Sequence, residues 1–247
     1  MSKKNKKPDR RTVRMLDESA PFAIKEAYNQ LRTNLLYTAN DASNCPVYAV
    51  TSAEAGDGKS TVISNLAISF AQANKKVLLV DADMRRPAQF QNFKLHKTQN
   101  GLSELLSGIN QYDESMLSTP FPNLFVLTSG CIPPNPSELM LSSKFEALVE
   151  QWKNDFDVIF IDLPPVGIVS DPLSVATFVD GYVFVVMANK TDARHLNAAI
   201  GTLEQINAKV LGTVLAGSNL KGERSYRYKY SYRNGYEYAD RSNSDKA

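Results

Sequence analysis

The stretch TSAEAGDGKST, residues 51–61, decides how this chain of 247 residues folds. It follows a short apolar run and leads into a segment whose apolar residues have helical spacing. Gly56 and Gly58 let backbone N–H groups turn inward around phosphate oxygens. Lys59 can reach the β- and γ-phosphates of a nucleotide, and the Ser60 hydroxyl can ligate Mg²⁺. The stretch therefore predicts a phosphate-binding loop, or P-loop, between a strand and a helix.

The loop departs from the general P-loop pattern at its first position, where Ala53 stands in place of glycine. Alanine there requires a backbone geometry that accommodates a Cβ atom. The alternative is an ordinary glycine-containing turn, which the GKST tetrad at 58–61 and the flanking strand and helix disfavour. The predicted nucleotide contacts are Ala55, Gly56, Asp57, Gly58, Lys59, Ser60 and Thr61.

On either side of the loop, short β-type runs alternate with helical segments along most of the chain. Six runs read as buried strands: residues 47–52, 77–83, 124–129, 158–162, 182–187 and 210–217. Helical spacing is clearest at residues 21–40, 60–74, 137–153 and 193–207. Strands that are buried on both faces and separated by helices imply right-handed crossovers. We expect an α/β fold: a doubly wound, mostly parallel sheet of P-loop NTPase type with helices on both faces.

Charge is unevenly distributed behind a formal net charge of +2. Residues 1–14 carry seven Lys and Arg against one acid, and residues 221–247 carry seven against four, so the body between them has a net charge of −7. Basic tails of this kind serve partners or surfaces rather than the fold. We expect a basic flexible segment at 1–20, one domain at 21–220 that begins with a helix, and a tyrosine-rich tail at 221–247.

The remaining composition points to the cytoplasm. No apolar run is long enough to span a bilayer, and the basic N-terminus lacks the apolar segment of a signal peptide. Cys45 and Cys131 lack metal-ligand spacing and read as reduced thiols. His96 and His195 have no nucleophile or metal ligand near them in the sequence and are expected at the surface.

A second motif, VLLVDADMRRP, ends a predicted strand in two carboxylates. Asp81 and Asp83 are two residues apart, so they lie on the same side of that strand. Ligands of open α/β sheets bind outside such strand ends. Carboxylates there can hold Mg²⁺ through its waters, and one can accept a proton from an incoming hydroxyl. Taken alone, the motif fits a pair of solvated carboxylates in a loop equally well.

A third motif, VIFIDLPP, places Asp162 at the end of another predicted strand, where a Walker B carboxylate faces Mg²⁺. Many strands end in aspartate, but the two prolines that follow and the two other motifs support this interpretation. The sequence therefore predicts a nucleoside-triphosphate site. Its predicted catalytic residues are Lys59, Asp81, Asp83 and Asp162, and its predicted metal ligands are Ser60, Asp81, Asp83 and Asp162. Asp171, which follows the Walker B loop, reads either as a site contact or as a helix N-cap.

With these motifs the chain resembles the bacterial protein-tyrosine kinases (BY-kinases). The resemblance extends over about residues 19–240 and includes the segment PPNPSEL at 133–139 and the tyrosine-rich tail. It implies ATP and Mg²⁺ as cofactors and Asp81 as the group that activates the tyrosine hydroxyl. It also implies that Asp83 and Asp162 organise Mg²⁺, and that Arg85 meets a phosphate or a neighbouring subunit.

Because no membrane-spanning segment is predicted, the chain is similar to the split type of Gram-positive bacteria. That type implies a membrane-anchored adaptor that recruits the kinase to the inner face of the membrane, a cognate tyrosine phosphatase, and a role in capsular and extracellular polysaccharide synthesis and export. No nucleic-acid partner is implied. A homo-oligomer, in the form of a ring, is expected through Glu26 and Arg32, although Asn29 replaces the arginine between them in the family pattern. A solvated helix face is the alternative for these residues.

The adenine-contacting residue stays open, because Ala216 and Gly217 stand near the end of the last strand and Asn219 comes slightly later. The tail holds the predicted phosphoacceptors Tyr226, Tyr228, Tyr230, Tyr232, Tyr236 and Tyr238. An exposed strand or a surface for stacking single-stranded nucleic acid are alternatives for this segment. The alternative function is a partitioning or cell-division ATPase acting on membrane or DNA. Such ATPases often carry a second lysine early in the loop, where this chain has Glu54.

Overall fold

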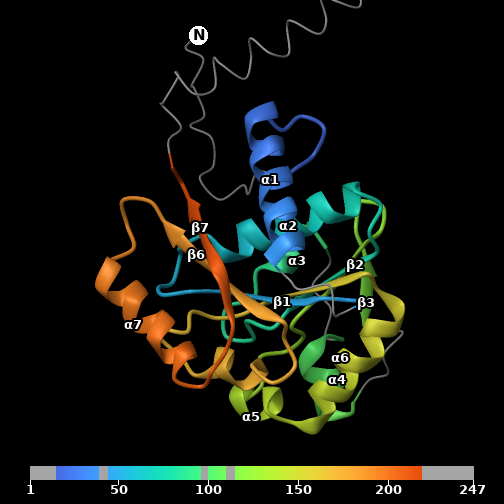
Figure 1. Ribbon diagram of the computed structural model, residues 1–247. Coiled ribbons are helices and arrows are strands. Elements are labelled where there is room, and N and C mark those ends of the chain that lie inside the picture. Colours follow the sequence, from blue (N-terminus) through green and yellow to red (C-terminus); the bar gives the residue numbers. More distant parts are fainter. Residues whose placement is uncertain (1–14, 39–43, 96–99, 110–114, 219–247) are drawn as a thin grey trace, which may run out of the picture. The chain divides into compact units, whose positions relative to one another are not determined.

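The computed structural model describes residues 15–38, 44–95, 100–109 and 115–218 (Figure 1). The chain divides into two units, residues 1–216 and 217–247. Only Gly217 and Ser218 of the second unit belong to the described residues. The architecture below is therefore that of the first unit.

A seven-stranded sheet forms the centre of this unit, with the strand order β3-β4-β2-β5-β1-β6-β7. The strands are β1 (Val47–Ser52), β2 (Val77–Asp81), β3 (Met116–Ser118), β4 (Leu124–Leu127), β5 (Val158–Asp162), β6 (Gly181–Met187) and β7 (Val210–Ala216). Only β3 runs antiparallel to its neighbour, and every other pair is parallel. The predicted doubly wound α/β fold with a mostly parallel sheet is confirmed.

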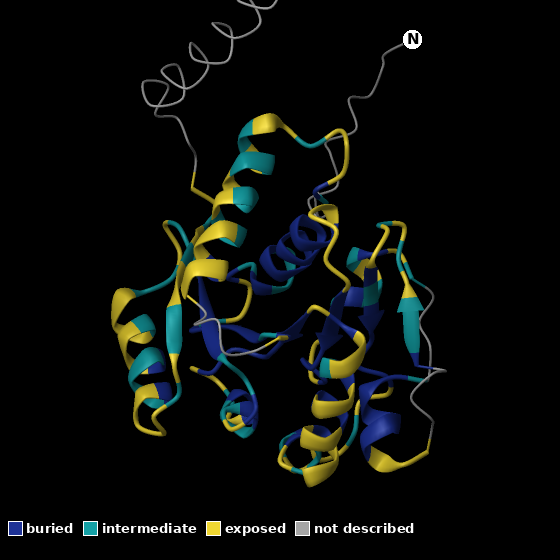
Figure 2. Cartoon of the chain, turned by 45° about the vertical axis from the view of Figure 1, so that its right-hand side comes forward, coloured by how far each residue is buried: buried dark blue, intermediate teal, exposed yellow. Residues whose placement is uncertain are grey.

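Helices cover both faces of the sheet (Figure 1). They are α1 (Phe22–Thr38), α2 (Lys59–Gln72), α3 (Gln89–Asn92), α4 (Leu102–Ser107), α5 (Pro136–Met140), α6 (Ser143–Asp155), the 3₁₀ helix η2 (Asp171–Val175) and α7 (Ala193–Glu204). The predicted helix at 137–153 is two helices, α5 and α6, separated at Leu141 and Ser142. Helix α2 is largely buried, whereas α1 buries only Leu35 (Figure 2).

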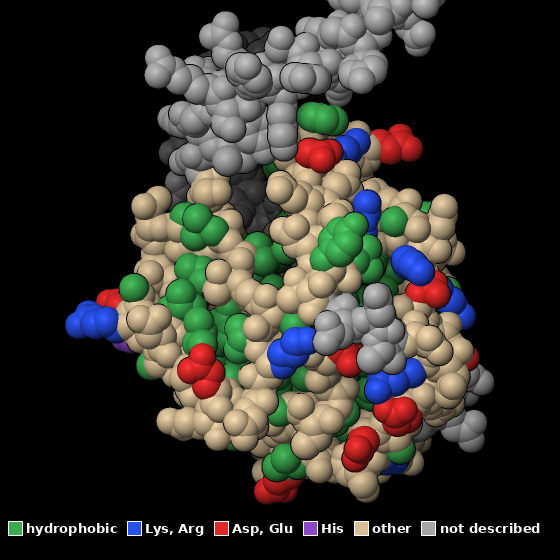
Figure 3. Space-filling view, viewed as in Figure 1, with side chains coloured by type: hydrophobic (Ala, Val, Ile, Leu, Met, Phe, Trp, Pro, Cys, Tyr) green, Lys and Arg blue, Asp and Glu red, His purple; other side chains and the backbone are tan. Residues whose placement is uncertain are grey.

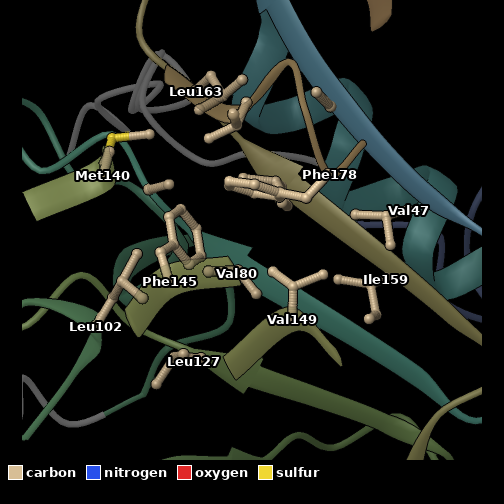
Figure 4. Packing of buried hydrophobic residues seen from close by; sticks show 14 of the residues in the cluster. Val47, Val80, Leu102, Leu127, Met140, Phe145, Val149, Ile159, Leu163 and Phe178 are labelled. Atoms are coloured by element: carbon tan, nitrogen blue, oxygen red, sulfur yellow. The ribbon is translucent and has the colours of Figure 1, made fainter. Parts of the chain in front are cut away.

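The alternation of side chains along β1 divides the core into two clusters. Tyr48 and Val50 pack with residues of α2, while Val47 and Ala49 face the opposite side. On that side, Phe145 of α6 lies among aliphatic side chains of the sheet such as Val80 (Figure 4). The central strands β1, β2 and β5 are fully buried, as their continuous apolar runs predict.

The strand predicted at 210–217 is present as β7, but the prediction that it is buried was wrong. Strand β7 pairs with β6 only and lies at the edge of the sheet, so its side chains are half-buried or exposed. Leu215 is 60% exposed. Apolar side chains reach the surface over the part of the face where Figure 1 draws β6 and β7 (Figure 3). An apolar run alone does not distinguish an edge strand from a central one.

The helices within the described ranges are either too short or too polar to cross a membrane.

Candidate active site

The P-loop connects β1 to α2 with two glycines in left-handed conformations. Gly56 has φ 79° and Gly58 has φ 87°, values that L-residues with side chains rarely adopt. Gly58 caps α2 without a side-chain hydrogen bond. The first N–H groups of the helix therefore remain available to an anion, as a phosphate site requires.

The start of the loop explains why alanine is tolerated there. Ala53 is buried and is not among the described residues with positive φ, so its Cβ causes no backbone strain. A glycine is required at a different position, Gly167 in the loop after β5, whose backbone closely approaches Ala53. A Cβ added to Gly167 would lie 2.4 Å from the carbonyl oxygen of Ala53. The glycine thus lets the loop after the Walker B strand press against the P-loop.

The four predicted catalytic residues meet at the carboxyl ends of adjacent strands. Asp81 of β2 and Asp162 of β5 are register partners, and both are fully buried. Asp83 lies just beyond β2 and is 3% exposed. The Lys59 Nζ donates to Asp83 Oδ2 over 2.7 Å. One ammonium group therefore faces three buried carboxyl groups.

This crowding changes the proton affinities of the cluster. Burial, and then the charge of Asp162, raise the pKa of Asp81 well above 3.8. Burial also raises the pKa of Asp162, although Lys59 and Ser60 oppose the shift. Burial alone lowers the pKa of Lys59, but Asp162 and Asp83 outweigh it and the net shift is upward. Lys59 thus stays charged, while the Asp81–Asp162 pair holds a proton to a higher pH than isolated carboxyl groups.

A buried amide, Gln89 of α3, links the carboxylates and was not predicted from the sequence. Its Nε2 donates to Asp162 Oδ2 over 2.7 Å, and its backbone N–H donates to Asp81 Oδ2 over 2.9 Å. Its Oε1 accepts from the Ser64 hydroxyl of α2 over 2.7 Å. Gln89 therefore fixes the orientation of both strand-end carboxyl groups. Glutamine carries no motif that would have marked it.

The cluster fits Mg²⁺ that arrives with a nucleotide. Asp81 Oδ1 and Asp162 Oδ1 are buried oxygens that accept no hydrogen bond from the described residues. Over the described part of the chain, no three His, Cys, Asp or Glu side chains converge to hold a metal by themselves. Mg²⁺ usually keeps several waters and takes one or two carboxylates together with substrate phosphates. The Asp162 oxygen beside the P-loop supplies part of such a ligand set, and the Asp81 oxygen remains available as a proton acceptor.

Comparisons with known proteins agree with this geometry. The family described as the AAA domain matches residues 46–210. The chain is 38% identical to tyrosine-protein kinase CpsD of Streptococcus agalactiae over 191 residues, which is 77% of this chain and 82% of CpsD. The chain belongs to the bacterial protein-tyrosine kinases. It is a P-loop tyrosine kinase similar to the split type of Gram-positive bacteria.

Two solved structures support the same conclusion for the kinase. The crystal structure of the chimerical protein CapA2B2 has a TM-score of 0.74 at 38% identity and covers 80% of this chain and 85% of its own. The kinase domain of Escherichia coli tyrosine kinase ETK has a TM-score of 0.74 at 30% identity, and the match covers 79% of this chain and 77% of the ETK domain. The partitioning-type ATPase is therefore not the family of this chain.

Arg85 of the kinase has a partner within the chain. Its Nε and Nη2 donate to the two carboxylate oxygens of Asp171 over 2.7 and 3.0 Å, and the Ser137 hydroxyl donates to the same carboxylate. In the structure Arg85 is paired with Asp171, whereas the resemblance implies a contact with a phosphate or a neighbouring subunit. Asp171 is not the N-cap of η2, because Ser170 holds that position. A contact of Asp171 with the nucleotide site stays a prediction. The pair connects the loop after β2 to η2 and α5.

Replacing Arg85 with methionine is expected to lower the free energy of unfolding by about 1–2 kcal/mol at pH 7, because Asp171 is fully buried and loses its counter-charge. This loss of unfolding free energy is smaller than for a fully buried ion pair, because the Arg85 side chain is 43% exposed. Burial raises the pKa of Asp171, but the bonds from Arg85 and Ser137 outweigh it and hold the pKa below 3.8. The stabilisation is therefore present above pH 3.8 and disappears as the pH falls below it.

Urea unfolding of Arg85→Met at several pH values checks this prediction. The matched control is Arg194→Met, which breaks an ion pair whose arginine side chain is 88% exposed and which should change little. An equal loss for both variants, or a loss for Arg85→Met that does not shrink as the pH falls below 3.8, would contradict the assignment.

The predicted oligomerisation residues lie on α1. Arg32 donates to the backbone oxygen and the hydroxyl of Ser69 on α2, the latter over 2.8 Å. Glu26 is half-buried, and the ion pairs of the described chain do not include it. Arg32 thus joins α1 to the domain, and a role for these residues between subunits stays a prediction. The six tail tyrosines, Asn219 and His96 lie outside the described residues.

The segment that follows β6 supplies P-loop contacts that the sequence did not reveal. His195, in the first turn of α7, is exposed as expected, but its Nδ1 lies 2.7 Å from Glu54 Oε1. Lys190 also reaches the loop, where it contacts Ala55 and Asp57. These contacts join residues more than a hundred positions apart, so no local pattern predicts them.

Proposed function

We propose that this kinase transfers the γ-phosphoryl group of ATP to tyrosines of its own C-terminal cluster, acting in trans between copies. Through this modification it regulates capsular and extracellular polysaccharide synthesis and export. The observation that carries the proposal is the convergence of Lys59 and the three carboxylates beside the P-loop. The tyrosine-rich tail supports a phenol, rather than water, as the acceptor.

In the proposed reaction the chain positions the nucleotide. Backbone N–H groups of residues 55–61 surround the phosphates, and Lys59 turns from Asp83 toward the β- and γ-phosphates. Ser60, Asp83 and Asp162 would hold Mg²⁺. Mg²⁺, when bound, neutralises charge on the phosphate oxygens.

Asp81 is proposed to take the proton of the tyrosine hydroxyl. Its Oδ2 is fixed by the N–H groups of Ala88 and Gln89, which leaves Oδ1 as the accepting atom. Burial and the charge of Asp162 raise the pKa of Asp81, which makes its carboxylate a stronger proton acceptor than an isolated one. A bond forms between the phenol oxygen and the γ-phosphorus, the bond to the bridging oxygen breaks, and ADP leaves with that oxygen.

An acceptor phenol also needs space near the nucleotide. A groove of about 460 Å³ borders the start of the P-loop and is lined in part by Ala53, Glu54, Val166, Ile168 and Ala198. Its aliphatic side chains suit an aromatic ring. The groove supports tyrosine transfer because hydrolysis requires only a positioned water.

We further propose that the tail leaves its docking position as it becomes phosphorylated. Each phosphotyrosine adds about −1.5 to −2 charges, so six would add about −9 to −12 to a tail of net charge +3. Attraction to the acidic body would then become repulsion. Light scattering before and after full phosphorylation checks this step, and an unchanged oligomer mass would contradict it.

The proposed partners follow from the family. A membrane-anchored adaptor would recruit the kinase from the cytoplasm to the inner face of the membrane and activate it, and the name of the related chimera CapA2B2 agrees with a kinase joined to a second polypeptide. A cognate tyrosine phosphatase would reverse the modification, and the kinase would act as a homo-oligomer. No nucleic-acid partner is proposed.

Transfer in trans is tested by mixing two full-length chains that a mass spectrometer can distinguish. Unlabelled wild type is incubated with ¹⁵N-labelled Lys59→Met, ATP and Mg²⁺, with and without a cytosolic peptide of a candidate adaptor. We expect phosphate on the heavy peptides that contain Tyr226–Tyr238, because the inactive chain can only be modified by its partner. Phosphotyrosine confined to the light peptides would contradict transfer in trans.

A further inference from the structure

A tight turn after β6 fixes the position of Lys190. Asn189 adopts a left-handed conformation with φ 59°, and the Lys190 N–H donates to the Met187 carbonyl over 3.2 Å. The Thr191 hydroxyl accepts from the Met187 N–H over 2.9 Å and closes the turn from the other side. The side chain of Lys190 therefore leaves the turn from a defined backbone.

That side chain ends on the P-loop. The Lys190 Nζ donates to the Ala55 carbonyl over 2.6 Å and to Asp57 Oδ1 over 3.1 Å. A Cβ added to Gly56 would lie 3.2 Å from the same nitrogen. A Cβ added to Gly58 would lie 3.2 Å from the methyl group of Met187. The turn thus packs against both glycines of the loop.

The contact between Lys190 and Asp57 is an ion pair that compensates a buried carboxylate. Its side chain is fully buried, and its Oδ2 accepts from the Glu54 N–H over 3.1 Å. A carboxylate inside a loop that binds phosphate opposes its ligand unless a cation compensates it. Among the ion pairs of the described residues, Asp57 has one partner, Lys190.

The second contact of Lys190 acts on a donor of the loop. The Ala55 carbonyl belongs to the peptide group whose N–H is that of Gly56. A charged donor on the carbonyl polarises this peptide and strengthens its N–H as a donor to phosphate. Both contacts therefore make the loop more attractive to an anion.

We infer that Lys190 is a positioning residue for the nucleotide phosphates: it neutralises Asp57 and polarises the Ala55–Gly56 peptide from outside the loop. The inference rests on the proposed binding of ATP at this P-loop. The loop itself offers one lysine, Lys59, and Lys190 supplies a second cation from a distant part of the chain. A purely mechanical brace would hold the loop in shape without depending on the charge of Asp57.

A double-mutant cycle separates the two roles. The affinity for Mg²⁺–ADP is measured by calorimetry, and KM for ATP and kcat are measured on the full chain, for Lys190→Gln, Asp57→Asn and the double variant. We expect Lys190→Gln to weaken ADP binding and raise KM about tenfold with kcat within about threefold. Asp57→Asn in that background should restore binding to within about threefold of wild type, because the uncompensated charge is gone.

Three further variants complete the experiment. Lys190→Arg should bind within about threefold of wild type because the charge is kept. Asp57→Asn alone should bind at least as well as wild type. Lys153→Gln is the matched control, since Lys153 forms a 2.7 Å ion pair with Glu150 on α6. This helix ends just before β5 begins, so the pair lies at the amino ends of the strands, opposite the nucleotide site. Thermal unfolding confirms that each variant is folded.

The outcomes are distinguishable. Unchanged binding by Lys190→Gln, equally weak binding by the double variant, or weakened binding by Asp57→Asn alone would overturn the inference and leave the proposed function standing. Wild type that binds neither ADP nor ATP would overturn the proposed function, and the inference with it.

Discussion

Lys59→Met is expected to lower tyrosine phosphorylation about 10²–10³-fold, the loss typical of removing one preorganised electrostatic donor from a transition state. Lys59 is the cation that the structure places against Asp83 and close to Asp81 and Asp162. A methionine of similar length keeps the packing and removes the charge. The rate of phosphotyrosine formation at saturating ATP measures the effect.

The same substitution is expected to lower the free energy of unfolding by about 2 kcal/mol, because the buried carboxylates lose their counter-charge. The loss stays below the 3–5 kcal/mol of a fully broken buried pair, since Asp81 and Asp162 can take up protons. Lys153→Met serves as the control for both measurements. Phosphorylation by Lys59→Met at the rate of wild type would refute the role of this lysine.

Asp81→Asn is expected to slow phosphorylation strongly and to stabilise the nucleotide-free protein. The loss of a general base lowers the rate about 10²–10⁴-fold. The asparagine oxygen can still accept from Ala88 and Gln89. Its amide N–H₂ would face Asp162, the register partner, whose Oδ1 accepts no hydrogen bond from the described residues. Removing a buried carboxyl that repels its neighbour should add about 1–3 kcal/mol to the free energy of unfolding.

The raised pKa of Asp81 also predicts how the free energy of unfolding changes with pH. Because the folded-state pKa of Asp81 is raised above 3.8, the folded chain holds a proton that the unfolded chain releases. Stability therefore falls as the pH rises from about 4 through the folded-state pKa, and Asp81→Asn should lack that fall. Chemical unfolding between pH 4 and 8 measures it, with the exposed Glu204→Gln as control. A variant that is less stable than wild type across this range would contradict the assignment.

Much of the site could be predicted because its signals are local. Gly56 and Gly58 mark left-handed turns, and an apolar run that ends in aspartate places a carboxylate at a strand end. Once the strands are recognised, parallel pairing brings Asp81 and Asp162 to the same edge of the sheet. The fold and the meeting of the four catalytic candidates follow from these patterns.

The missed features depend on contacts across the fold. Gln89 and Lys190 belong to residue types that usually lie in solvent, and only the packing of α3 and of the turn after β6 brings them to the site. Arg85 was expected at a phosphate or a neighbouring subunit because it follows the carboxylates in its motif, whereas the structure pairs it with Asp171 of η2. The exposure of β7 depends on its place at the edge of the sheet. No local pattern encodes these pairings.

The central claim is that this P-loop site transfers phosphate to tyrosine rather than to water. The most direct measurement incubates the full-length kinase with Mg²⁺ and γ-labelled ATP, with and without a cytosolic adaptor peptide, and quantifies phosphotyrosine against free phosphate. We expect label on peptides that contain Tyr226–Tyr238, increased by the adaptor peptide and reduced about 10²–10³-fold in Lys59→Met. Release of free phosphate without phosphotyrosine under every condition would contradict the account and identify water as the acceptor.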